Sequence, residues 1–225
     1  MINTVIFDLD NTLYDYNLLH PKAMLRLKQY VCTRFHVESK AFEEAFDSAR
    51  RETKETLANT AASHNRLLYC QKTLEHLRLP PTEGALEMYD VYWDYFMQNM
   101  ELRPGAEELL RYCEEHQIKV GICSDLTAHI QYRKLQALRI ESGIDALVTS
   151  EEAGVEKPNP RMFNMILDKL NSRSEDSLFV GDDLERDILG AEGVGMAAMW
   201  LGGHDRENAI ASLEDVKKRL ENESK

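Results

Sequence analysis

The sequence has no long hydrophobic run and little cysteine. It contains no stretch of about 18 apolar residues, the length that a membrane-crossing helix needs. It does not open with a basic segment followed by an apolar one, as a signal peptide does. The chain has four cysteines, at spacings that match no zinc-binding pattern, and we expect reduced thiols in a cytoplasmic protein. They are Cys32, Cys70, Cys113 and Cys123.

Positive charge is also scarce. The chain has 27 Lys and Arg residues against 39 Asp and Glu residues, a formal net charge of −12. Nucleic acids and anionic membranes bind basic surfaces, so neither is expected as a partner. A small anionic substrate remains compatible, because a local cation can override the overall charge. With 225 residues and 43% hydrophobic content, the chain can form a globular core with a smaller second domain, as a monomer or weak dimer.

The first predicted strand ends in carboxylates. Val5, Ile6 and Phe7 form an apolar run typical of a strand that is buried on both faces. Asp8 and Asp10 follow, and in extended backbone they project to the same side with Cα atoms about 6.5 Å apart. Such a pair of carboxylates can bind Mg²⁺. The alternative is a polar turn after an edge strand, with Asn11 and Thr12 in turn and capping roles.

The hydrophobic pattern changes twice along the chain. Between residues 16 and 100 it has a helical period and predicts four amphipathic helices in a small bundle. From residue 101 onward, predicted strands and helices alternate, which indicates an α/β fold with a doubly wound, mostly parallel, Rossmann-like sheet. Because the first strand must join that sheet, we expect a core of residues 1–15 and 101–225, with residues 16–100 inserted as a helical domain.

The later elements of this core are predicted from the same pattern. The expected strands are Lys119–Cys123, Ala146–Thr149, Leu178–Gly181 and Met196–Leu201, and the expected helices include Ala128–Leu138, one that begins at Pro160, Arg186–Glu192 and Ile210–Glu221. Glu221–Lys225 is predicted as a polar tail.

Polar residues follow the ends of several predicted strands. Ser124 ends the second strand, Lys157 lies in the loop after the third, and Asp182 follows the fourth. Ligands of open parallel sheets bind at the carboxyl ends of the strands, so these side chains are expected to meet Asp8 and Asp10. Mg²⁺ would hold the carboxylates together, and a phosphoryl group would satisfy Lys157 and Ser124. Each residue also has a simpler interpretation when it is taken alone. Ser124 could be a helix cap, and Lys157 could be a solvated loop residue.

Four motifs in this order resemble those of the haloacid dehalogenase superfamily, in its phosphatase branch. They are DLDNT from Asp8, Ser124 after an apolar strand, Lys157 in GVEKPNP, and GDDLERD from Gly181. The position of the helical insertion resembles the family's α-helical cap of the first type. The sequence departs from the pattern at Asp125, where family members often have Asn.

The resemblance implies a role for each matching residue. Asp8 would be the nucleophile that forms an aspartyl-phosphate, and Asp10 the general acid and base. The metal ligands would be Asp8, the backbone carbonyl of Asp10, and Asp182 with Asp187 in support. The phosphate would be bound by Asn11, Ser124 and Lys157. Ser124 and Lys157 would also be catalytic residues. The roles of Asp125 and Asp183 stay open.

The expected function is Mg²⁺-dependent hydrolysis of a phosphomonoester in a small metabolite, which is a nucleotide, a sugar phosphate or a short-chain phosphate. Three alternatives are a sugar phosphomutase, a haloalkanoate dehalogenase and a non-enzymatic binding or regulatory module. In the helical domain, His64 and Arg66 lie in a polar connection, Asn59–Arg66, and are the residues there expected to select the leaving group. The alternative is that both lie on a solvated loop.

Overall fold

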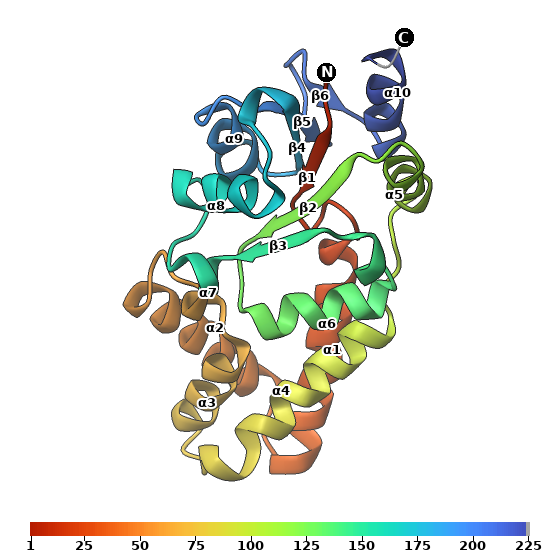
Figure 1. Cartoon of the computed structure of the whole chain (residues 1–225). Helices are drawn as coiled ribbons and strands as arrows, with labels where there is room; N and C mark the ends of the chain where they lie inside the picture. The colour runs from red at the N-terminus through yellow and green to blue at the C-terminus, as the bar shows by residue number, and fades with distance from the viewer. Residues whose placement is uncertain (224–225) are drawn as a thin grey trace. The chain divides into compact units, whose positions relative to one another are not determined.

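The computed structural model describes residues 1–223 and divides the chain into two compact units (Figure 1). The core unit comprises Met1–Asp15 and Glu101–Lys225, and the helical unit comprises Tyr16–Met100. Among the described residues, no helix combines the length and apolar composition that a membrane span needs.

The core unit contains a six-stranded sheet in the order β3-β2-β1-β4-β5-β6. Every neighbouring pair in it is parallel. β1 (Thr4–Phe7) lies between β2 (Lys119–Ser124) and β4 (Ser177–Gly181), and all four of its residues are buried. The remaining strands are β3 (Ala146–Thr149), β5 (Ala197–Leu201) and β6 (Ala209–Ile210). The predicted α/β class and parallel sheet are confirmed.

Helices cover both faces of this sheet. α5 (Ala106–Glu115) and α10 (Leu213–Glu223) lie on one face, and α8 (Pro160–Leu170) and α9 (Gly190–Glu192) lie on the other (Figure 1). α8 begins where the sequence predicts, because the Asn159 side chain accepts a hydrogen bond from the Arg161 backbone N–H at 3.0 Å. The other core elements are α6 (Ala128–Leu138), α7 (Ser150–Ala153) and the short turns η2 (Glu141–Gly143), η3 (Ser174–Asp176) and η4 (Leu184–Leu189).

Close packing of α8 on the sheet depends on a glycine in β2. A Cβ atom at Gly121 would lie 2.8 Å from Cδ1 of Leu170 and 3.1 Å from Cγ1 of Ile166. These distances are shorter than van der Waals contacts between carbon atoms. The absence of a side chain at Gly121 therefore lets α8 approach the centre of the sheet.

The helical unit contains α1 (Tyr16–Phe35), α2 (Ser39–Thr56), η1 (Ala61–His64), α3 (Arg66–His76) and α4 (Pro81–Gln98). α4 packs on α1 and α3, and α2 packs on α3. Tyr92, Trp93 and Phe96 of α4 are almost completely buried, so they belong to the core of this unit.

The structure differs from the sequence prediction near the C-terminus. β6 was not expected, and it is only two residues long, too short for a periodic signal. α10 begins at Leu213 because the Asp215 carboxylate accepts hydrogen bonds from the backbone N–H groups of Ser212 and Ala211. β5 begins at Ala197, one residue later than expected. Of the expected polar tail, residues 221–223 continue α10 and residues 224–225 lie outside the described chain.

The helix expected over Arg186–Glu192 is divided into two short elements. Its first part is the π-helical turn η4, and its second part is the three-residue helix α9. The Asp183 carboxylate accepts hydrogen bonds from the backbone N–H groups of Glu185 and Arg186, at 3.0 and 2.9 Å. This cap starts the turn at Leu184, two residues before the expected position.

Candidate active site

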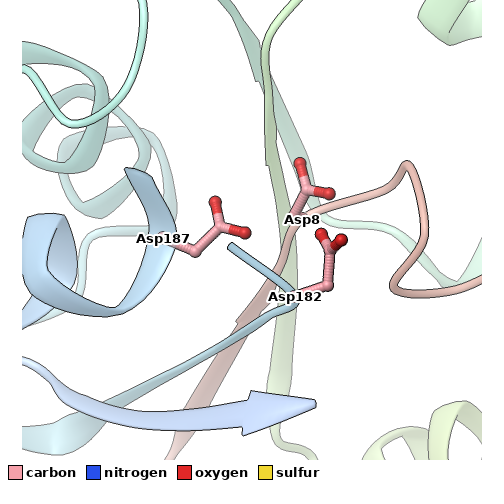
Figure 2. A group of neighbouring side chains, drawn as sticks. All are labelled: Asp8, Asp182 and Asp187. Carbon is pink, nitrogen blue, oxygen red and sulfur yellow. The ribbon is translucent and has the colours of Figure 1, made fainter. Parts of the chain in front are cut away.

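Three carboxylates gather at the carboxyl ends of the two central strands. Asp8 follows β1, Asp182 follows β4, and Asp187 comes from η4. One oxygen from each of these side chains lies within 4.8 Å of the others, and Figure 2 shows the three side chains converging. Gly181 makes this possible, because a Cβ atom at that position would overlap the Asp187 side chain.

Lys157 bridges two of these carboxylates. Its Nζ atom lies 2.6 Å from Oδ1 of Asp8 and 2.6 Å from Oδ1 of Asp187. Burial alone would lower the pKa of Lys157, but the carboxylates of Asp187 and Asp8 raise it well above its ordinary value. The lysine is therefore a buried cation held between two carboxylates.

One lysine does not neutralise three carboxylates. Burial raises the pKa of Asp182 to about 6, and the nearby charge of Asp187 contributes to this shift. Burial also raises the pKa of Asp8, against the opposing effect of Lys157. A cation bound among the carboxylates would relieve this repulsion. The oxygen donors and the surplus of negative charge both fit a divalent cation.

The Asp10 side chain does not belong to this cluster; it faces α6. Its carboxylate accepts hydrogen bonds from the Tyr14 hydroxyl, from Nζ of Lys134 at 2.5 Å and from Nε2 of Gln131 at 3.3 Å. Burial alone would raise the pKa of Asp10, but the Lys134 ammonium and these hydrogen bonds lower it below its ordinary value. The expected metal contact of the Asp10 backbone carbonyl stays a prediction.

Ser124 and Asn11, the other expected phosphate contacts, lie at the ends of β2 and β1. Ser124 is the last residue of β2, is 1% exposed, and its hydroxyl accepts a hydrogen bond of 2.8 Å from Gln131. Asn11 lies in the turn after β1 with φ = 61°, a left-handed conformation that asparagine adopts more readily than most residues. The phosphate contacts of both residues stay predictions.

Asp125 and Asp183, whose roles the sequence leaves open, contact the surrounding backbone, and Asp125 also pairs with the Arg186 side chain. The Asp125 carboxylate accepts a hydrogen bond of 3.0 Å from the Lys157 backbone N–H and lies 3.3 Å from Nη1 of Arg186. Asp183 caps η4. Asp125 thus helps to fix the loop that carries Lys157.

Lys134 and Gln131 also lie at this site, although the motifs of the sequence did not predict them. Both lie on α6 and are almost completely buried, at 1% and 0% exposure. A signal for them exists in the sequence, because Gln131, Lys134 and Leu138 are spaced to share one face of the predicted helix. A lysine on the buried face of a helix next to a carboxylate-rich strand end marks a candidate site residue.

The fold and the strand-end cluster agree with the family to which the sequence is matched. The sequence model of the haloacid dehalogenase-like hydrolase family matches residues 2–195 of this chain. The chain belongs to this family, which confirms the resemblance seen in the four motifs and the prediction of a hydrolase.

Curated relatives match over nearly the whole chain. A ribulose-1,5-bisphosphate 5-phosphatase from Halopiger xanaduensis is 39% identical, over 95% of this chain and 90% of the relative. A glyceraldehyde 3-phosphate phosphatase from Pyrococcus abyssi is 28% identical, over 100% of this chain and 96% of the relative.

Solved structures share the fold. A phosphatase of this family from Thermococcus onnurineus aligns with a TM-score of 0.72 at 23% identity, over 97% of this chain and 98% of the other. A 2-haloacid dehalogenase from Pseudomonas syringae aligns with a TM-score of 0.79 at 21% identity, over 99% of both chains. At such identities the likeness concerns the fold alone.

Proposed function

We propose that the protein is a Mg²⁺-dependent phosphatase that hydrolyses the phosphomonoester of a small sugar phosphate through an aspartyl-phosphate. The observation that carries this proposal is the pairing of Lys157 with Asp8 inside the carboxylate cluster at the strand ends. A carboxylate next to a buried cation is suited to attack an anionic phosphate, which a cluster of carboxylates alone would repel. The phosphatase names of the relatives support the same reaction.

In the first half of the reaction, an oxygen of Asp8 attacks phosphorus and forms the aspartyl-phosphate. The bond between phosphorus and the ester oxygen breaks, and the leaving alkoxide takes a proton from Asp10. Asp10 has a lowered pKa in the free protein, so it must first gain a proton. The negative charge of a bound phosphate favours this protonation, since like charges disfavour the carboxylate form.

In the second half, a water molecule attacks phosphorus and Asp10 removes its proton. The bond between phosphorus and Asp8 breaks, and the products are inorganic phosphate and the regenerated carboxylate. The lowered pKa of Asp10 suits this step, because the carboxylate is the form that accepts a proton. Lys157 and Ser124 would bind the phosphate oxygens throughout, with Asn11 beside them.

Asp8 and Asp182 would hold Mg²⁺ with the Asp10 backbone carbonyl, and Asp187 would support them. When bound, the cation neutralises the carboxylates and the charge that develops on the transferred phosphoryl group. The chain's own residues supply the nucleophile, the proton transfers and the phosphate cradle.

The substrate class rests on the relatives. Ribulose 1,5-bisphosphate and glyceraldehyde 3-phosphate, the compounds in the names of the two relatives, are short sugar phosphates. Relatives named for a pyrimidine nucleotide and for N-acylneuraminate 9-phosphate are 37% and 26% identical, the first over 52% of this chain. We therefore propose a sugar phosphate before a nucleotide, in a monomeric or weakly dimeric cytoplasmic protein.

A substrate panel tests this function. Purified protein with Mg²⁺ is assayed for phosphate release from ribulose 1,5-bisphosphate, glyceraldehyde 3-phosphate, a pyrimidine nucleotide and N-acylneuraminate 9-phosphate. We expect the highest kcat/KM on one of the first two and no turnover with excess EDTA. Interconversion of hexose phosphates without phosphate release would identify a mutase, halide release from a 2-haloacid a dehalogenase, and no turnover of any compound a binding module.

A further inference from the structure

Two buried polar residues of α6 contact Asp10, and one of them also contacts the end of β2. Gln131 and Lys134 are three residues apart on this helix, so they lie on the same face. Lys134 is paired with Asp10 at 2.5 Å, and Gln131 donates to Asp10, to the Ser124 hydroxyl and to the Asp125 backbone carbonyl. Gln131 thus connects the expected general acid and base to the expected phosphate ligand.

These contacts leave the Asp10 carboxylate little rotational freedom. Its Oδ1 accepts hydrogen bonds from Tyr14 and Lys134, and its Oδ2 accepts one from Gln131. The three donors come from two different segments, the turn after β1 and α6. A carboxylate held at both oxygens from two sides stays in one rotamer and stays apart from the cluster of Asp8, Asp182 and Asp187.

Burying a lysine is costly, and an apolar residue at this position of α6 would avoid that cost. Stability therefore does not explain Lys134 well. Proton transfer in an enzyme requires that the acid or base be held within hydrogen-bonding reach of the reacting oxygen, and a displacement of about 1 Å can cost about a hundredfold in rate. A fixed ammonium beside Asp10 meets this requirement.

We propose that Lys134 is a positioning residue that holds the Asp10 carboxylate in the orientation needed for proton transfer, and that Gln131 couples this orientation to the Ser124 hydroxyl. The inference rests on the proposed function, because it assigns Lys134 an effect that acts through Asp10. Lys134 itself does not contact the reacting atoms in this proposal.

The experiment is a double-mutant cycle with two substrates, in which the full chain carries Lys134→Met, Asp10→Asn or both. Phenyl phosphate has a poor leaving group that needs a proton, whereas p-nitrophenyl phosphate has a good one. We expect Lys134→Met to lower kcat/KM, which reports the first half of the reaction, by about 10- to 100-fold on phenyl phosphate and by less than about threefold on p-nitrophenyl phosphate. In the Asp10→Asn background the same substitution is expected to change kcat/KM by less than about twofold.

Two further variants separate positioning from structural support. Lys134→Arg retains the cation and is expected to recover part of the activity on phenyl phosphate. Lys169→Met removes another ion-paired lysine of the core unit, which lies 2.7 Å from Glu152, and is expected to leave both substrates unaffected. Thermal unfolding of each variant shows whether it folds. Because Asp10 is 26% exposed, water can solvate its carboxylate when Lys134 is replaced.

An equal loss of kcat/KM on both substrates, or an equal loss with and without Asp10, would overturn the proposal and leave Lys134 a purely structural residue. If Lys134→Met does not fold, Gln131→Met takes its place in the same cycle with the same expected pattern. A wild-type protein that releases phosphate from neither substrate, nor from any compound of the panel, refutes the proposed function itself. These two failures are therefore distinguishable.

Discussion

Lys157 and Asp8 form a buried ion pair in which Nζ lies 2.6 Å from Oδ1, and the same ammonium lies equally close to Asp187. The Lys157 side chain thus neutralises part of the charge of the expected nucleophile, and it also fixes Asp187, which is expected to support the metal ligands. The position of Lys157 depends in turn on the Asp125 carboxylate, which accepts the Lys157 backbone N–H at 3.0 Å.

Replacing the nucleophile is expected to abolish turnover without unfolding the protein. Asp8→Asn is nearly isosteric but cannot form the aspartyl-phosphate, so phosphate release should fall below about 1% of the wild-type rate. Lys157 keeps its contact with Asp187, so the buried ammonium is not left alone. The matched control is Asp168→Asn, an exposed aspartate on α8. Activity of Asp8→Asn above that level would rule out the nucleophile assignment.

Removing the Lys157 ammonium from the carboxylate cluster is expected to destabilise the metal-free protein strongly. Lys157→Met leaves Asp8 and Asp187 without their shared partner, and breaking a buried pair in this way costs about 3–5 kcal/mol. We expect Mg²⁺ to recover part of this loss, because a bound divalent cation replaces the missing positive charge. Thermal unfolding of the variant with EDTA and with Mg²⁺ measures both effects. A variant as stable as wild type in EDTA would contradict the central role of Lys157.

This destabilisation is also expected to depend on pH. Without Lys157, the pKa of Asp8, already raised by burial, rises further above its unfolded value. A carboxyl group with a raised pKa binds a proton more readily in the folded state, so stability increases as pH falls. The loss caused by Lys157→Met should therefore be smaller at pH 5 than at pH 7.5, and the reverse order would contradict it.

Metal binding is expected to weaken as Asp182 gains a proton. The pKa of Asp182 in the metal-free protein is raised to about 6, chiefly by burial. Below that pH the carboxyl group is mostly neutral and a metal ion must displace its proton. We expect the increase in Tm that Mg²⁺ gives to be large at pH 7.5 and to shrink steadily below pH 6. Asp182→Asn should give a small increase at both pH values. A shift in Tm independent of pH in the wild type would contradict this assignment.

The sequence predicted those site residues that directly follow strands, since the carboxyl ends of parallel strands meet at one edge of the sheet. Asp8 and Asp182 directly follow β1 and β4 and come together as this rule predicts, and Lys157 reaches them from the loop after β3. The sequence pattern could not predict where the Asp10 side chain points. The direction of that carboxylate depends on hydrogen-bond donors from α6, which lie more than 120 residues away along the chain.

The limits of the fold prediction have a similar cause. Strong apolar runs such as β1 predict a strand without any tertiary information. β6 has two residues and exists because Ala209 and Ile210 pair with Trp200 and Leu201 of β5. Such a short strand depends on its neighbour and leaves no periodic signal in the sequence.

Arg66 illustrates the same dependence in the helical unit. The sequence places it in a polar connection, where we expected it to be free to select a leaving group. Its guanidinium instead lies over the Tyr92 ring, with Cζ 4.1 Å from the ring centroid, and donates to the Tyr16 hydroxyl. Arg66 therefore contributes to the packing of α1, α3 and α4, and its role in selecting a substrate stays a prediction.

His20 lies beside Arg66 in the helical unit. Its Nδ1 atom is 2.9 Å from the Tyr92 hydroxyl. Burial, assisted by the charge of Arg66, lowers the pKa of His20 to about 3. In the unfolded chain the imidazole has a pKa of about 6.5, so between these two values the unfolded state binds more protons. The free energy of unfolding should therefore fall as the pH decreases below about 6.5.

Urea unfolding at pH 7.5 and pH 5.0 measures this effect. The chain has two tryptophans, so Trp200→Phe leaves Trp93 of α4 as a fluorescent probe of the helical unit. His20→Asn, made in the Trp200→Phe parent, removes the titrating group. Between pH 7.5 and pH 5.0 we expect its free energy of unfolding to fall less than that of the parent, with a difference of up to about 2 kcal/mol. His36→Asn is the matched control, because His36 is exposed and its φ of 54° suits asparagine. If His20→Asn and its parent lose equal stability on acidification, His20 is not the group that takes up the proton on unfolding.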